Sequence, residues 1–115
     1  MGYDIHITRK EYWVDEDGPT ISLEDWLAYV ASDPDLRLSP ESKSMALMAV
    51  PGSKYPTAWL DWDHGDIYTK NPDEPILAKM LLIASALGAK VQGDDGEFYR
   101  SANFDDTYYG EGGHP

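Results

Sequence analysis

Hydrophobic and polar residues alternate from the third residue, so that Tyr3, Ile5 and Ile7 share one face of an extended segment. Such alternation is typical of a strand with one buried and one exposed face. The strand predicted here covers residues 3–8. Apolar runs bounded by turn residues predict further strands over residues 45–50, 55–62, 67–70 and 89–92. A short segment at 97–99 is placed to pair with the last of these.

Helical spacing replaces alternation after residue 22. Ser22 is a good N-cap, and the pair Asp33-Pro34 ends the predicted helix. The apolar residues recur at i, i+3, i+4 and i+7, namely Leu23, Trp26, Leu27 and Val30. This spacing places them on one face of an amphipathic helix.

A second helix is predicted over residues 76–87, with Asp73 as its cap and Gly88 as its C-terminal stop. Apolar side chains surround most of it, and only Lys79 and Ser85 interrupt them. A helix of this kind lies at the centre of a core or is partly covered by another chain.

Together these elements predict an α+β fold, with a mostly antiparallel sheet of four to five strands and two helices packed on one face. The expected organisation is a single domain over residues 1–100. Residues 101–115 are acidic and rich in glycine, and we expect them to form a flexible tail.

Charge restricts the possible partners. The 115 residues include 21 acidic and 9 basic ones, for a net charge of -12, and the acids occur in every third of the chain. Nucleic acid and anionic membranes would repel such a surface. The acidity serves solubility alone, or it attracts a basic protein partner.

Several features indicate a cytoplasmic protein. There are 0 cysteines, so disulfides and thiolate metal sites are excluded. The N-terminus lacks the basic-then-apolar order of a signal peptide. No run approaches the roughly 20 apolar residues of a membrane helix.

The stretch WLDWDHGDIY, residues 59–68, raises the possibility of a metal site. A calcium loop starting at Asp61 would need glycine at its sixth position and glutamate at its twelfth, where Asp66 and Pro72 stand. A transition-metal site remains as an alternative, because imidazole and carboxylate are suitable ligands. Its candidate ligands are Asp4, His6, Asp61 and His64.

Other catalytic patterns are missing. The chain has neither a cysteine nucleophile nor a Gly-x-Ser-x-Gly elbow. The turn Gly93-Asp94-Asp95-Gly96 places two negative charges where a phosphate would bind. We therefore expect a protein that is not an enzyme and has no cofactor.

Aromatic residues stand near acidic ones at four places: Tyr12-Trp13 near Asp15, Trp59 and Trp62 near Asp61 and Asp63, Phe98-Tyr99 after Glu97, and Tyr108-Tyr109 after Asp105-Asp106. Tryptophan and tyrosine are enriched at protein interfaces, and acidic neighbours favour a basic partner. The candidate partner-binding residues are Trp59, Asp61, Asp63, Asp66, Asp94, Asp95 and Glu97.

Three segments, YDIHITR (3–9), ISLEDWLAYVASDP (21–34) and NPDEPILAKMLLIASALGAKVQGDDGEFY (71–99), resemble a family of short, acidic, uncharacterised bacterial proteins. In character this family is similar to immunity proteins of interbacterial toxin systems. The resemblance implies a protein that covers the active site of a toxin domain, and it assigns no functional residue. The alternatives are a small metal-dependent or carboxylate-using enzyme and an acidic housekeeping or regulatory protein.

Overall fold

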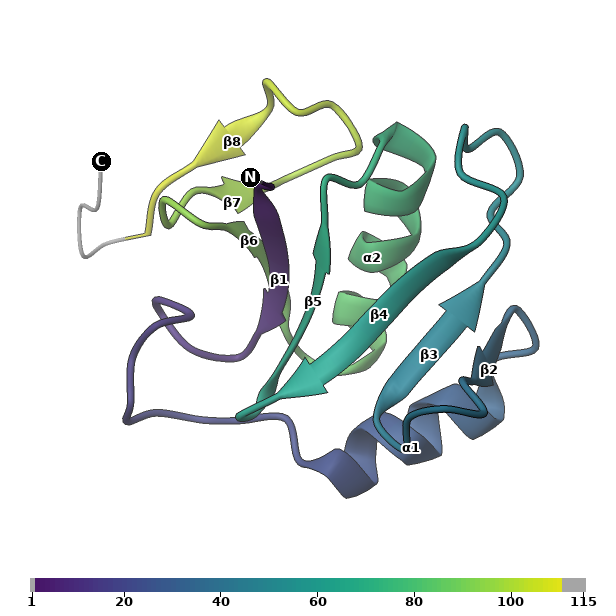
Figure 1. Ribbon diagram of the computed structural model, residues 1–115. Coiled ribbons are helices and arrows are strands. Elements are labelled where there is room, and N and C mark those ends of the chain that lie inside the picture. Colours follow the sequence, from purple (N-terminus) through teal and green to yellow (C-terminus); the bar gives the residue numbers. More distant parts are fainter. Residues whose placement is uncertain (1, 111–115) are drawn as a thin grey trace.

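The computed structural model describes residues 2–110, which form a small α+β domain with one antiparallel sheet and two helices (Figure 1). The elements follow in the order β1 (Asp4–Thr8), α1 (Leu23–Ser32), β2 (Leu36–Leu38), β3 (Met45–Met48), β4 (Ala58–Asp63), β5 (Asp66–Lys70), α2 (Glu74–Ala86), β6 (Lys90–Gly93), β7 (Phe98–Tyr99) and β8 (Thr107–Tyr108). The strand order across the sheet is β2-β3-β4-β5-β1-β6-β7-β8.

The predicted number of strands is wrong, because the sheet has 8 strands instead of four to five. The short strands account for the difference: β2 has 3 residues, and β7 and β8 have 2 each. Strands of this length are too short to show alternation and exist because a neighbouring strand offers its free backbone groups. β8 lies within the predicted tail and pairs with β7, whereas residues 111–115 lie outside the described residues.

The N-terminal strand occupies the middle of the sheet. β1 pairs with β5 on one side and with β6 on the other, antiparallel in both cases. β5 and β6 therefore run parallel to each other, and α2 connects them across the back of the sheet (Figure 1). This split β-α-β arrangement brings the first residues of the chain beside residues about ninety positions later.

One face of the sheet forms the core. Ile5 and Ile7 are buried on this face, and their pairing partners across β5 include Ile67. Both helices contribute to the same hydrophobic cluster, α1 through Trp26 and Val30. The buried residues of α2 are Ile76, Leu77, Met80, Ile83 and Ala84.

The predicted helix caps are confirmed. The Ser22 side chain accepts a hydrogen bond from Asp25 N at 3.0 Å, and the Asp73 side chain accepts one from Ile76 N at 3.3 Å. Burial in the core explains the apolar character of α2, although Leu82 remains 66% exposed. Within the described residues neither helix has the length and apolar character needed to cross a bilayer.

The opposite face of the sheet is called the front face below. It carries the side chains that alternate along the strands with those of the core. His6 and Tyr68 are cross-strand partners on this face, as are Tyr68 and Asp61. α2 lies behind the sheet in Figure 1, so the front face faces the viewer, and a loop over residues 9–20 passes beside it.

A candidate binding groove on the front face

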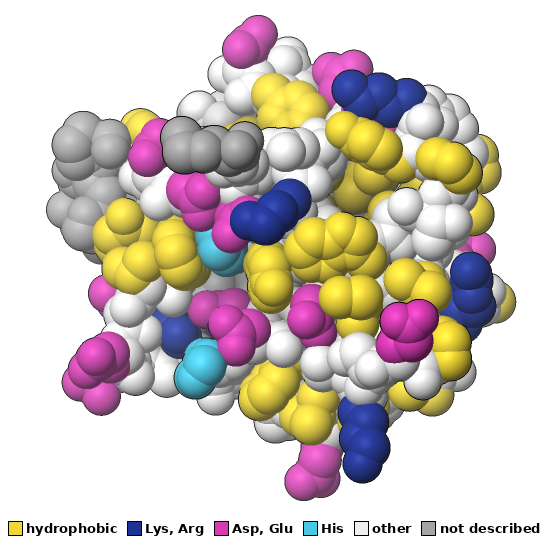
Figure 2. Space-filling model, viewed as in Figure 1, with side chains coloured by type: hydrophobic (Ala, Val, Ile, Leu, Met, Phe, Trp, Pro, Cys, Tyr) yellow, Lys and Arg dark blue, Asp and Glu magenta, His cyan; other side chains and the backbone are white. Residues whose placement is uncertain are grey.

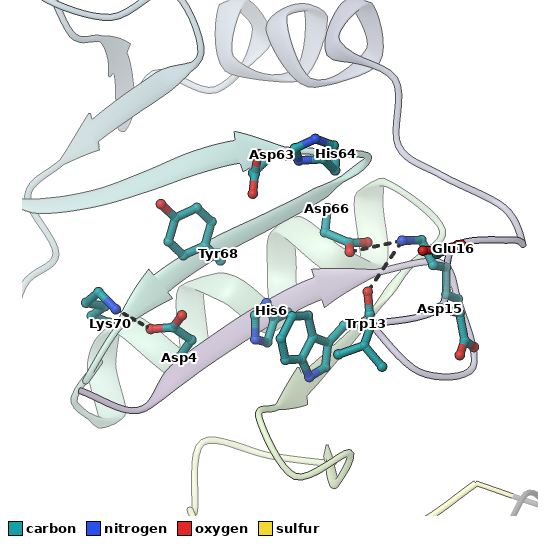
Figure 3. A pocket seen from close by; sticks show the side chains of 12 residues that line it. Asp4, His6, Trp13, Asp15, Glu16, Asp63, His64, Asp66, Tyr68 and Lys70 are labelled. Atoms are coloured by element: carbon teal, nitrogen blue, oxygen red, sulfur yellow. Dashed lines mark hydrogen bonds and ion pairs between the residues drawn. The ribbon is translucent and has the colours of Figure 1, made fainter. Parts of the chain in front are cut away.

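A groove of about 750 Å³ lies on the front face (Figure 3). Three segments supply its walls: β1, the loop 9–20, and the hairpin formed by β4 and β5. The lining residues are Asp4 and His6; Lys10, Trp13, Val14, Asp15 and Glu16; and Asp63, His64, Asp66, Tyr68 and Lys70.

His6 is held rigidly in this groove. Its Nε2 lies 2.9 Å from Asp94 Oδ1, and its ring stacks on Trp13 with centroids 3.9 Å apart and an interplanar angle of 10°. The other oxygen of Asp94 accepts a hydrogen bond from Asp4 N at 2.8 Å. The histidine is only 5% exposed, so its position is determined by these partners.

Gln92 of β6 fastens the loop that forms one wall. Its side chain is completely buried, and its Oε1 accepts a hydrogen bond from Trp13 N at 2.8 Å. Its Nε2 donates to the carbonyls of Glu11 and Gly96, each at 3.0 Å. Trp13 Nε1 donates to the Asp94 carbonyl at 3.2 Å, so the loop is attached through both the backbone and the indole.

An ion pair lies toward each end of the groove (Figure 3). Lys70 Nζ lies 2.9 Å from Asp4 Oδ1. Lys10 Nζ lies 3.4 Å from Asp66 Oδ2 and donates to the Trp13 carbonyl at the same distance. Both members of the second pair are buried, and Asp66 Oδ1 has no hydrogen-bond partner within the described part of the chain.

Gly65 shapes the tip of the hairpin. It has a φ of +91°, which favours glycine, and an added Cβ would lie 2.6 Å from Thr20 Cβ. The Gly65 carbonyl accepts a hydrogen bond from Ile21 N at 2.8 Å. The glycine in WLDWDHGDIY therefore allows the hairpin and the end of the loop to pack against each other.

The predicted partner-binding residues of this hairpin separate into two groups. Asp63 is exposed, and Trp59 is half-buried with its ring edge-on to Tyr68 at 5.4 Å. Asp61 is also half-buried and accepts a hydrogen bond from Ser44 Oγ at 2.7 Å. Asp66, in contrast, is buried on the floor of the groove, where it pairs with Lys10, so it is not one of the exposed acids of the hairpin.

The residues of the second acidic turn have different environments. Asp95 is exposed, whereas Asp94 is bound to His6 and to the backbone of β1. Glu97 accepts hydrogen bonds from the hydroxyls of Tyr3 and Tyr99. The carboxylates of Asp94 and Glu97 therefore hold neighbouring strands together.

The alternative metal site is not assembled as predicted. Asp4 and His6 lie close together, but their third acidic neighbour is Asp94, and one ligand atom from each lies within 4.8 Å of the others. Asp61 does not line the groove, and the exposed His64 pairs with Asp63 at 2.7 Å. Asp94 is 88 residues from His6 in sequence, so only the pairing of β1 with β6 brings them together.

Negative charge dominates the electrostatics of the groove. Five carboxylates and two lysines line it. Burial, followed by the charges of Asp61, Asp63 and Asp4, raises the pKa of Tyr68. The hydrogen bond to Asp4 raises the pKa of Lys70. The excess of carboxylates over lysines favours cations in the groove.

The sequence analysis did not include seven groove residues among its candidates, namely Lys10, Trp13, Val14, Asp15, Glu16, Tyr68 and Lys70. Trp13 stands two positions before Asp15, and this aromatic–acidic proximity was the one available signal for it. The space-filling view in Figure 2 shows acidic and hydrophobic side chains interspersed over the front face, with histidine among them.

Comparison with protein-family models, with curated proteins and with solved structures finds no match for this chain. The geometry of the groove and the character of its residues are therefore the basis for the functional proposal.

Proposed function

We propose that the protein is a binding module that docks onto a basic protein partner through its front face and groove. The observation that carries this proposal is a groove of about 750 Å³ whose walls combine aromatic rings with an excess of carboxylates. Such a surface offers a large contact area through its rings and favourable long-range attraction through its charge.

The front-face side chains of the β4–β5 hairpin support the proposal of a docking surface. Trp59 and Tyr68 contact each other on the front face, and Asp61 and Asp63 flank them on the same strand pair. Core packing does not require aromatic side chains on the solvent side of a sheet. Interfaces, however, are enriched in tryptophan and tyrosine surrounded by a polar rim.

The particular form we propose is an immunity protein that covers the active site of a bacterial toxin domain. The net charge of -12 supports it, because a toxin that acts on nucleic acid holds phosphate in a basic site. An acidic surface occupies such a site by presenting the same charge as the substrate. The resemblance of residues 3–9, 21–34 and 71–99 to a family of similar character points to the same form.

The test uses the purified product of the neighbouring gene as the partner and calorimetry at low salt as the measurement. We expect the double variant Asp61→Asn with Asp63→Asn to weaken binding about tenfold, since each lost charge contact costs about 0.5–1 kcal/mol. The control variant, Glu41→Gln with Asp105→Asn, removes the same charge from exposed positions outside the groove and should change affinity less than twofold. Equal effects of the two double variants would contradict the proposed docking surface.

A second candidate, a metal-dependent enzyme, is favoured by the grouping of Asp4, His6 and Asp94. A cation there would have to separate His6 from Asp94 and compete with Lys70 for Asp4. The competing pairs make this the less favoured function. Calorimetric titration with Zn²⁺ and Mn²⁺ tests it: binding of one equivalent that Asp94→Asn abolishes would support it, and no binding would contradict it.

A further inference from the structure

We propose that the groove receives an arginine side chain of the partner, whose guanidinium group lies among Asp63, Asp66 and Tyr68. This inference rests on the proposed function, because it names the group by which the front face would recognise a basic protein. The argument concerns the charges of the groove, the free hydrogen-bonding capacity of its floor and the shape of its walls.

The floor contains a carboxylate oxygen without a partner. The Asp66 side chain is 9% exposed, and its buried Oδ1 accepts no hydrogen bond from residues 2–110. Its other oxygen lies 3.4 Å from Lys10 Nζ, at the long end of hydrogen-bonding distance. A buried carboxylate is costly when its lone pairs are unsatisfied, so a donor from a ligand would stabilise it.

The lysines of the groove do not neutralise its carboxylates. Lys70 is paired with Asp4 toward one end, and Lys10 divides its amino group between Asp66 and the Trp13 carbonyl toward the other. Asp63, on the hairpin wall between these ends, pairs with the exposed His64, its one ion-pair partner among residues 2–110 (Figure 3). Asp15 and Glu16 add two exposed carboxylates at the loop wall. The middle of the groove is therefore short of positive charge.

The walls are suited to a flat cation. Tyr68 and Trp13 both line the groove, and each is fixed by neighbours, Tyr68 by the edge contact with Trp59 and Trp13 by stacking on His6. Guanidinium is planar, packs on aromatic rings and donates five hydrogen bonds in a fixed fork. A lysine ammonium would satisfy the charge alone, because it is compact and strongly hydrated.

The test is a titration of the full chain with short peptides, followed by ¹⁵N-resolved NMR at low salt. The probes are acetyl-Gly-Arg-Gly-amide, the same peptide with lysine, and the same peptide with citrulline, which keeps the shape of arginine but has no charge. We expect the arginine peptide to shift the Trp13 indole signal and the amide signals of residues 63–68. It should bind at least fivefold more tightly than either other peptide.

Two variants make the assignment specific. Asp63→Asn should weaken arginine-peptide binding about three- to tenfold, because one charge-assisted contact is removed. Asp105→Asn changes the net charge equally at an exposed position outside the groove and should leave the affinity unchanged. Asp63 is exposed, so its substitution should not unfold the protein, and an unchanged amide spectrum of the variant will verify this.

Equal affinity for the citrulline peptide, or equal effects of the two variants, would overturn the arginine assignment. The failure of the proposed function has a different signature, in which the variants at Asp61 and Asp63 bind the partner protein normally. Arginine-specific shifts that map to the groove would support the inference whichever result the partner experiment gives.

Discussion

Glu97 illustrates how the environment of one residue determines its role. On charge alone it belongs with the exposed acids, but its carboxylate lies over Gly93 and accepts hydrogen bonds from Tyr3 and Tyr99. Burial, together with the neighbouring carboxylate, raises the pKa of both tyrosines. These hydroxyls therefore remain protonated donors, and the cluster joins the beginning of the chain to β7.

Replacement of Gly93 by alanine tests this cluster. The three atoms nearest to an added Cβ all belong to the Glu97 carboxyl group, at 2.4 to 2.6 Å. We expect the carboxylate to be displaced from both tyrosines and the free energy of unfolding, measured by urea denaturation, to fall by about 1–3 kcal/mol.

The matched control introduces Gly93→Ala into a Glu97→Ala background. Without the carboxyl group there is no clash, so the alanine should be nearly neutral there and the two substitutions strongly non-additive. A similar loss of stability in both backgrounds would show that the close contact with Glu97 is not the reason for glycine at this position.

The loop over residues 9–20 shows how one element depends on another that is distant in sequence. It contains no helix or strand, and Gln92 of β6 holds it through Trp13 N and the Glu11 carbonyl. Because this loop forms a wall of the groove, the glutamine positions the site without lining it.

We predict that Gln92→Leu releases the loop. The substitution keeps the volume but leaves Trp13 N and two carbonyls without their partner, which should lower the free energy of unfolding by about 1–3 kcal/mol. Hydrogen exchange should accelerate at the amides of residues 10–16 far more than at those of α2, which serves as the internal control. An equal acceleration in both segments would indicate global destabilisation instead.

The whole molecule carries a net charge of -12 on 115 residues, so repulsion among its carboxylates opposes the compact state. Most of its ion pairs have at least one exposed member and contribute little to stability. Lys10 and Asp66 form a buried pair, and half-buried Lys79 of α2 pairs with buried Asp33 at the end of α1.

At neutral pH we therefore expect salt to stabilise the protein. Raising NaCl from about 20 to 300 mM shortens the screening length from roughly 20 Å to 6 Å and should increase the free energy of unfolding by about 1 kcal/mol. The variant Glu41→Gln with Asp105→Asn should respond less, because it carries less charge. A decrease in stability with salt would mean that attraction within the ion pairs outweighs the repulsion.

Local patterns predicted the regular elements well. Alternation located β1, and spacing and capping located both helices. These features depend on residues that are neighbours in the chain. The strands of two or three residues could not be predicted, because a partner strand, and not their own pattern, makes them extended.

The amino-acid sequence by itself determined the acidic surface, the helices and their caps, and the face on which Ile5 and Ile7 are buried. The tertiary structure alone decided which acids remain available. It placed β1 between β5 and β6, and this placement brought His6 to Asp94, fastened Trp13 to Gln92 and buried Asp66 beside Lys10. The reason is physical: charge and periodicity are local properties, whereas a groove arises from segments that only the sheet topology brings together.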